Sequence, residues 1–397
     1  MAHLAPRWLF FWSFLGFVLL SSLIFDFYWP AHGIYDITGD VFGRDFLNVW
    51  MASRLLATHQ ILDAFDLHRY MTHIRGIFGI HYPFHNWSYP PSIFPFLYPF
   101  SPLGYIPALI LWTALGLLVY ALATPLATGG THRYLPYLLL LTSPAAQGNI
   151  LSGQNGFFTA ACFVGGFYLL KRRPYVAGIL FGLLTIKPQL GLLIPVALLL
   201  MRQWRAILAA GLTTAALVGI SLIFWGGEPW HLYFTTVAGY QKHLLVVSQG
   251  FYVAMMPGTF AAARIAGFDY EPAMLIHALI AIPAALLAWR IAALEGATPR
   301  SILALAIASM LATPYGYNYD LTTVAAALLA YLCARPIAST GEQFFYGLLW
   351  LLPTATFDIM FNELPIAPLV LLAALTRCAL SKPSDPRSTI HDSPLTC

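Results

Sequence analysis

The chain has 397 residues, of which 59% are hydrophobic and only 9% are charged, and its formal net charge is +4. A soluble globular domain usually carries about 25% charged residues, so this composition excludes an ordinary soluble protein. Many apolar runs approach the roughly 20 residues that a helix needs to cross a bilayer. The sequence therefore predicts an all-α polytopic membrane protein, whose basic residues mark cytoplasmic loops rather than a nucleic-acid surface.

The first apolar run extends from Trp8 to Phe25 and follows Arg7. The residues after it are bulky and do not resemble the small-residue cleavage site of a secretory signal peptide. We therefore expect an uncleaved anchor whose N-terminus lies in the cytoplasm, and a cleaved signal peptide is the alternative.

The second segment is a loop from Ala31 to Tyr89, which is too long for a simple connector. Its aspartates are Asp36, Asp40, Asp45, Asp63 and Asp66. In contrast, Leu67 to Gly227 contains no acidic residue. Carboxylates that gather in one extramembrane loop indicate chemistry on the aqueous side. Within the loop, Asp45 to Ala57 has helical periodicity and predicts an amphipathic helix lying on the membrane, with Asp45 in its first turn.

After this loop, basic residues at the expected cytoplasmic ends divide the chain into hairpins. These hairpins are Tyr134 to Leu170, Pro174 to Met201, Ser301 to Ala334 and Phe344 to Leu380. A crossing at Ala206 to Gly226, a second extracytoplasmic loop at Gly227 to Gly250 and a return at Met274 to Trp289 connect them. We expect about twelve crossings with both termini in the cytoplasm. A single membrane domain would cover residues 1–380, and a tail rich in Ser, Pro and Asp, residues 381–397, would be disordered in the cytoplasm.

The hairpin from Pro174 to Met201 is informative because it is short. Each arm has about 14 residues, which is about 21 Å of helix, whereas the hydrocarbon core is about 30 Å thick. Its apex, Lys187-Pro188, should therefore stay below the far surface unless a water-filled cavity enters the membrane. A lysine there is costly unless it faces water or an anion, so Lys187 is a candidate partner for a phosphate. The alternative is a lysine that snorkels to the outer interface.

This arrangement suits the transfer of a sugar from a lipid phosphate, because no nucleotide-sugar pool exists outside the cytoplasm. The reaction needs a base for the acceptor proton, a cation for the phosphate, and aromatic and amide groups for the sugar. One base is enough if the anomeric centre inverts. Asp45 is the candidate base, unless it only stabilises the helix N-terminus. Asp36 and Asp40 are further candidate bases or solvated loop acids, and Arg44 could meet phosphate or anchor to lipid headgroups.

Polar side chains also gather at two predicted hairpin tips. Gln154 and Asn155, in Ser-Gly-Gln-Asn-Gly, could bind sugar hydroxyls or merely form the turn. The second tip, Tyr315 to Asp320, contains Tyr315, Tyr317 and Tyr319. An aromatic belt at the membrane interface would explain these tyrosines, but it would not explain Asp320.

Neither the cysteines nor the histidines predict a metal site or another cofactor. The cysteines are Cys162, Cys333, Cys378 and Cys397, which lie in or next to apolar segments or at the C-terminus. His81 and His85 are four residues apart, but Pro83 breaks the helix that would align them.

Taken in order, several pieces of the chain resemble glycosyltransferase family 87. Its members are polytopic enzymes of the GT-C class, and they include mycobacterial polyprenyl-phosphate-mannose-dependent α-1,2-mannosyltransferases. The matching pieces are Gly43-Arg44-Asp45-Phe46-Leu47-Asn48-Val49-Trp50, Phe84-His85-Asn86-Trp87-Ser88-Tyr89-Pro90-Pro91, Ser152-Gly153-Gln154-Asn155-Gly156, Lys187-Pro188-Gln189, Ala312-Thr313-Pro314-Tyr315 and Tyr319-Asp320. The resemblance covers most of Arg7 to about Arg335 and implies an inverting transferase whose catalytic aspartate falls on Asp45. No histidine stands near Tyr319, where the mycobacterial members have one, so we expect different substrate contacts there.

We therefore expect a GT-C-type transferase in the cell (inner) membrane, with its active site on the extracytoplasmic side. It would move a hexose, mannose by the resemblance, from a polyprenyl-phosphate donor to a hydroxyl of a lipid or glycan. The expected site residues are Asp45 as base, Lys187 and Arg44 for the donor phosphate, and Asp40, His85, Trp87, Tyr89, Gln154, Asn155, Tyr319 and Asp320 for the sugar or acceptor. A lipid transporter or flippase is the alternative and would show a continuous two-sided pathway. A structural subunit would show no cavity.

Overall fold

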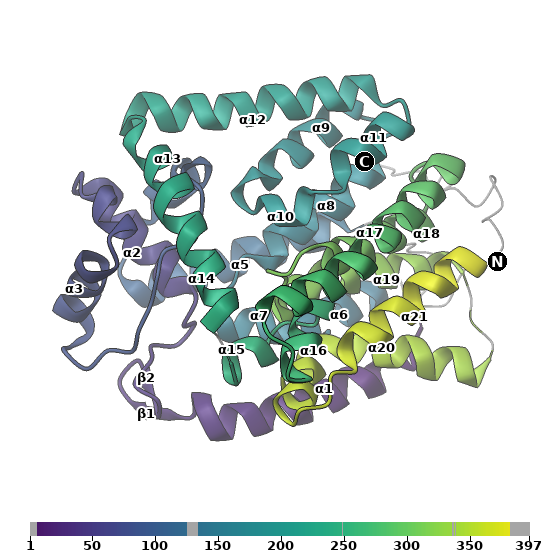
Figure 1. Ribbon diagram of the computed structural model, residues 1–397, viewed down its shortest axis with the longest axis horizontal. Coiled ribbons are helices and arrows are strands. Elements are labelled where there is room, and N and C mark those ends of the chain that lie inside the picture. The colour runs from purple at the N-terminus through teal and green to yellow at the C-terminus, as the bar shows by residue number, and fades with distance from the viewer. Residues whose placement is uncertain (1–5, 125–133, 248, 336, 338, 382–397) are drawn as a thin grey trace.

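The computed structural model describes residues 6–124, 134–247, 249–335, 337 and 339–381. Nearly all of its secondary structure is helical (Figure 1). The sheet found in the described residues has two short antiparallel strands, β1 (Pro30–His32) and β2 (Tyr35–Asp36). Helices dominate because an apolar segment in lipid must satisfy its backbone N–H and C=O groups internally. The all-α expectation is confirmed.

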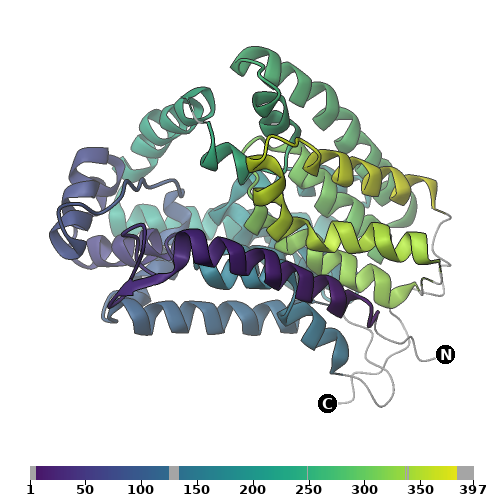
Figure 2. The same cartoon turned by 90° about the horizontal axis from the view of Figure 1, so that it is seen from below.

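Five helical segments in the described part of the chain are long and apolar enough to cross a membrane. They are α1 (Leu9–Leu23) with its π-helical extension η1 (Ile24–Tyr28), α5 (Tyr105–Ala123), α12 (Trp204–Trp225), α17 (Tyr270–Glu295) and α20 (Thr340–Phe361). Figure 2 shows α1 in purple running along the near face of the molecule. Five further apolar stretches have only 10–17 residues, so these helices do not confirm the expected twelve crossings.

Three of the shorter helices form the centre of the bundle. These are α8 (Gly156–Leu169), α18 (Pro299–Ala312) and α19 (Thr322–Ala334), and α21 (Ala367–Leu380) packs against α18. Every residue of α18 from Pro299 to Leu311 is buried, and so is every residue of α19 from Thr322 to Cys333. Because protein surrounds them, these helices provide a rigid support for the short 3₁₀ turn between them, η7 (Asn318–Leu321).

The expected short hairpin is present and is broken at its tip. It consists of α9 (Pro174–Leu183), η5 (Leu184–Ile186), α10 (Pro188–Gly191) and α11 (Ile194–Leu200). Lys187 lies between η5 and α10, where Pro188 starts the new helix. Gly178 allows α9 to approach α12 closely, since a Cβ atom there would lie 2.3 Å from the carbonyl oxygen of Ala206.

The first long loop and residues 90–100 after it form an outer region, which contributes most of a second hydrophobic core. It contains α2 (Phe46–Ala57), η2 (Ile61–Phe65), α3 (Leu67–Phe78), η3 (Pro91–Ile93), α4 (Phe94–Leu97) and η4 (Tyr98–Phe100). The helix expected after Asp45 is confirmed, but its expected place on the membrane surface is wrong. Nine of the twelve residues of α2 are buried in protein, because α4, η4 and α5 pack against it.

The remaining helices connect these parts. They are α6 (Leu135–Leu141), α7 (Pro144–Ser152), α13 (Glu228–Leu232), the π-helical turn η6 (Tyr233–Val237), α14 (Ala238–Val247), α15 (Phe251–Ala254) and α16 (Thr259–Ile265). In Figure 1, α13 and α14 descend across the molecule from the end of α12 to α15. The expected tail, residues 381–397, lies outside the described residues except for Ser381.

Candidate active site

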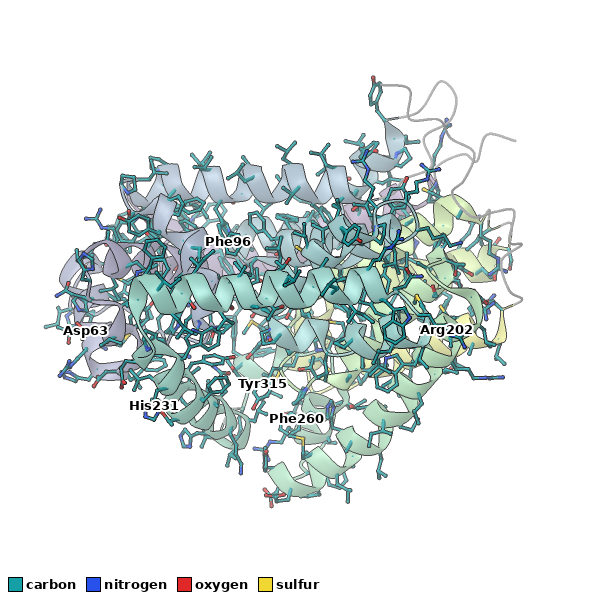
Figure 3. The ribbon with its side chains drawn as sticks, turned by 90° about the horizontal axis from the view of Figure 1, so that it is seen from above. Asp63, Phe96, Arg202, His231, Phe260 and Tyr315 are labelled. Atoms are coloured by element: carbon teal, nitrogen blue, oxygen red, sulfur yellow. The ribbon has the colours of Figure 1, made fainter. Side chains whose placement is uncertain are left out.

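A cavity of about 400 Å³ lies between the outer region and the helix bundle. This volume is in the range that small-molecule sites occupy. Its polar lining residues are Asp45, Asn48, Asn86, Ser88, Tyr89, Gln154, Lys187, Gln189, Tyr233, Gln241, Tyr252, Tyr315, Tyr317 and Tyr319. Figure 3 places Tyr315 near the middle of the molecule, with Asp63 and Arg202 at opposite ends. Residues from distant parts of the chain thus converge on one space.

Asp45 occupies the N-cap position of α2, and its backbone N–H donates to the carbonyl oxygen of Ser152 at 3.0 Å. This contact requires close approach of two segments. Gly153 has φ +68°, and a Cβ atom there would lie 2.7 Å from the Cβ atom of Phe46. Only glycine meets both conditions without strain. The glycine in Ser-Gly-Gln-Asn-Gly therefore holds the start of α2 against the end of α7.

The surroundings of Asp45 make its carboxylate a stronger base than that of an exposed aspartate. Burial raises the pKa of Asp45 above its ordinary value, because desolvation disfavours the charged form. His85, a hydrogen bond from Gln154, and Lys187 each act in the opposite direction. A carboxylate with a raised pKa accepts a proton more readily, which suits a general base.

Lys187 enters the same cavity from the tip of its hairpin and is only 4% exposed. Its Nζ donates to Oδ1 of Asp320 at 2.5 Å and to Oδ1 of Asn155 at 3.4 Å. It also lies 4.7 Å from the centre of the Tyr319 ring. Asp320 and Asn155 do not line the cavity and contact Lys187 from behind. The charge of the lysine is thus compensated by a buried partner.

Gln154 connects Asp45 with Tyr89, one of the tyrosines that line the cavity. Its Oε1 accepts hydrogen bonds from the Tyr89 hydroxyl and from the backbone N–H of Asn155, both at 3.3 Å. These bonds orient the amide so that its nitrogen faces Asp45. On the other side, Tyr317 and Tyr319 stack with 5.2 Å between ring centres. The cavity therefore combines a carboxylate, an ammonium group, amides and tyrosines, which is a suitable set for binding and transferring a sugar phosphate.

A family model described as "Glycosyltransferase family 87" matches residues 87–314, which is more than half of the chain. The chain belongs to glycosyltransferase family 87. The family expected from the sequence is thereby confirmed, and so is the general activity of a glycosyltransferase. No curated protein and no solved structure matches the chain. Gln154 and Lys187 lie inside the matched residues of this family 87 member, whereas Asp45 and Asp320 lie outside them.

Arg44 and Asp40 do not line the cavity of this family 87 protein. The Arg44 guanidinium donates to Oδ2 of Asp36 through Nε at 3.0 Å and Nη2 at 2.8 Å. It also contacts Thr38 and lies 3.6 Å from Oδ2 of Asp40. Burial raises the pKa of Asp40, which Arg44 opposes. Together these groups hold the loop before α2 and are not free to meet a ligand in the cavity.

The piece from His85 to Tyr89 is divided between the cavity wall and the layer behind it. Tyr89 lines the cavity, but His85 and Trp87 do not. Nε2 of His85 lies 3.2 Å from the carbonyl oxygen of Arg44, and Trp87 is only 2% exposed. Among the described residues, no group of three or more His, Cys, Asp or Glu is placed to hold a metal ion.

Several lining residues were not among the expected site residues. Asn48 stands one helical turn after Asp45, and its Oδ1 accepts from the Tyr70 hydroxyl at 2.8 Å. Tyr233 and Gln241 come from η6 and α14, in the segment Gly227 to Gly250, for which the sequence predicts no role in the site. The sequence contains a pattern that could have indicated them. Tyr233, Val237 and Gln241 follow one another at intervals of four residues and therefore share one helical face.

A second, smaller cavity of about 60 Å³ meets the first at Asp45, Met255 and Tyr319. Its other walls are mainly apolar and come from α1, α7, α15 and α20, including Leu23, Phe251 and Phe357. Asp45 therefore lines two cavities, and the walls of the smaller one are mainly apolar.

Proposed function

We propose that this glycosyltransferase is an inverting hexosyltransferase that uses a polyprenyl-phosphate sugar as donor. The acceptor is a hydroxyl group of a lipid or glycan, and mannose is the first candidate for the sugar. The single observation that carries this proposal is that Asp45 and Lys187 line the same cavity. They are 142 positions apart in the chain and provide a base and a cation in one space.

In the proposed reaction, a carboxylate oxygen of Asp45 takes the proton of the acceptor hydroxyl. The acceptor oxygen attacks the anomeric carbon, and the bond from that carbon to the phosphate oxygen breaks. Polyprenyl phosphate leaves, and Lys187 stabilises the charge that develops on it. Phosphate is a good leaving group, so one carboxylate is sufficient and the anomeric configuration inverts.

The remaining lining residues suit the sugar. Tyr317 and Tyr319 offer stacked ring faces, and Asn48 and Gln189 offer amide groups. The smaller cavity that Asp45 also lines has mainly apolar walls, which suit a few apolar atoms of a lipid substrate next to the carboxylate. The family match favours transfer of a sugar over the transporter alternative.

We place this activity at the extracytoplasmic face of the cell membrane, with both termini in the cytoplasm. The outer region with the acidic residues supports this orientation. Asp63 of this region and Arg202, at the end of the short hairpin, lie at opposite ends of the molecule in Figure 3. Basic residues favour cytoplasmic ends of membrane helices.

The test is a transfer assay with purified protein in lipid nanodiscs. Radiolabelled polyprenyl-phosphate mannose and the matching glucose donor are incubated with lipid and glycan acceptors, and products are separated by chromatography. We expect product with wild-type protein and a loss of about 10²- to 10⁴-fold in kcat for Asp45→Asn. Asp66→Asn is the matched control, because asparagine caps a helix as well as aspartate does and Asp66 caps α3. Full activity of Asp45→Asn would remove this residue from the mechanism.

A further inference from the structure

Asp320 lies next to the cavity but has no surface that faces it. The residue is 0% exposed and is part of η7, between the buried helices α18 and α19. Its Oδ1 accepts from Nζ of Lys187 at 2.5 Å, and its Oδ2 accepts from the backbone N–H of Tyr317 at 3.1 Å. Both oxygens are therefore already engaged, and a sugar in the cavity has no access to them.

Lys187 has the opposite position, because it lines the cavity. Two of its three N–H groups are directed at Asp320 and Asn155, which leaves one for the cavity. The aromatic face of Tyr319 limits its movement from a third direction. A buried ammonium group without a partner would lose its proton or destabilise the fold. Asp320 removes this cost and fixes the place of the Nζ atom.

We propose that Asp320 is a positioning residue for Lys187 and does not bind the sugar. It holds the lysine charged at the cavity wall, with one N–H directed to where the donor phosphate lies. This inference rests on the proposed function, since it assumes a phosphate donor. It assigns Asp320 to recognition of the phosphate, through Lys187, and not to recognition of the sugar or the acceptor.

Because Asp320 and Lys187 act as one unit, their effects on the phosphate should not add. Asp320→Asn should weaken binding of polyprenyl phosphate, which carries no sugar, because the lysine loses its fixed position. A variant that already lacks the lysine should not respond to the same change. An aspartate that contacts the sugar would behave differently, since it would affect only ligands that carry the sugar.

The experiment measures binding of polyprenyl phosphate, and separately of polyprenyl-phosphate mannose, to purified protein in nanodiscs. The variants are Lys187→Gln, Asp320→Asn and the two combined. The control is Asp358→Asn, because this carboxylate on α20 lines neither cavity. We expect Asp320→Asn to weaken the binding of polyprenyl phosphate by about tenfold or more. The combined variant should bind both ligands within about twofold of Lys187→Gln, and the control should match wild type.

Each contrary result identifies what has failed. Unchanged binding of polyprenyl phosphate by Asp320→Asn, or additive losses in the combined variant, would overturn the positioning role. Wild-type protein that binds neither ligand would overturn the proposed donor itself. If Asp320→Asn does not fold, Lys187→Gln and the combined variant decide the question, because a sugar contact from Asp320 would make the combined variant weaker for the sugar-bearing ligand only.

Discussion

Arg44 and Asp45 are neighbours in the chain, but their side chains lie in different surroundings. The Arg44 guanidinium is 2.8 Å from Asp36 and 3.9 Å from the centre of the Tyr28 ring. The Asp45 side chain lines both cavities. The first residue therefore stabilises the loop, and the second is placed to meet substrates.

Replacing Arg44 should mainly lower stability. Arg44→Gln leaves the buried carboxylate of Asp36 without its cation, and removing one partner of a buried pair costs about 3–5 kcal/mol. Thermal unfolding in detergent measures the effect. Arg69→Gln is the control, since its pair with Asp63 is exposed and should contribute about 0–1 kcal/mol. An Arg44→Gln protein with normal stability but a strongly raised donor KM would show that Arg44 meets the phosphate after all.

The pH dependence of transfer should report the raised pKa of Asp45. The base acts when it is deprotonated, so kcat/KM should fall as the pH decreases through a pKa above the ordinary value of 3.8. Gln154→Ala removes a hydrogen bond that lowers this pKa, so the acidic limb should move to higher pH.

Gln189→Ala serves as the comparison for that pH profile, because Gln189 is another amide that lines the cavity. Its acidic limb should stay at the wild-type position even if the rate changes. An acidic limb that Gln154→Ala leaves in place would mean that another group controls it.

Replacing both Lys187 and Asp320 should restore stability without restoring activity. Lys187→Met leaves the buried carboxylate of Asp320 without its cation, which should cost about 3 kcal/mol or more. Adding Asp320→Leu should recover most of this loss, because apolar side chains replace both charges, but transfer should remain low. Unfolding temperature and donor kcat/KM are measured on the same preparations. Recovery of both quantities together would exclude a role for Lys187 in the reaction.

Gly153→Ala should disturb the position of Asp45. The new Cβ would lie 2.7 Å from Phe46 in a backbone with φ +68°, so we expect a loss of about 1–3 kcal/mol and a reduced kcat. Gly211→Ala is the control, because its new Cβ within α12 would meet no atom within 4 Å apart from the neighbouring residues and the backbone of its own helix. Normal activity in Gly153→Ala would show that the contact between α2 and α7 does not position the base.

Local sequence was sufficient for some features of this protein. Low charge and long apolar runs require helices, because isolated strands leave backbone groups unpaired in lipid. The sequence predicted the tip of the short hairpin at Lys187-Pro188, and in the structure η5 ends and α10 begins there. The order of the motif pieces predicted the family, which the match over residues 87–314 confirms.

Other features depend on contacts between distant segments. Periodicity after Asp45 predicted α2 but not its burial, which α4, η4 and α5 cause. The number of crossings was not recoverable either, because short broken helices such as α10 can be supported by protein instead of spanning lipid.

Composition and motif order determine the helical membrane class and the family. Both can be read along the chain, because an apolar run and the backbone hydrogen bonds of a helix involve residues that are close together in the sequence. The partners of the charged side chains are a property of the tertiary structure. Asp320 lies 133 positions after Lys187, and the two meet because α18, which precedes η7, packs against α10 at the tip of the broken hairpin. An ion pair depends on distance in space and on burial, and neither is encoded in the spacing of its two residues.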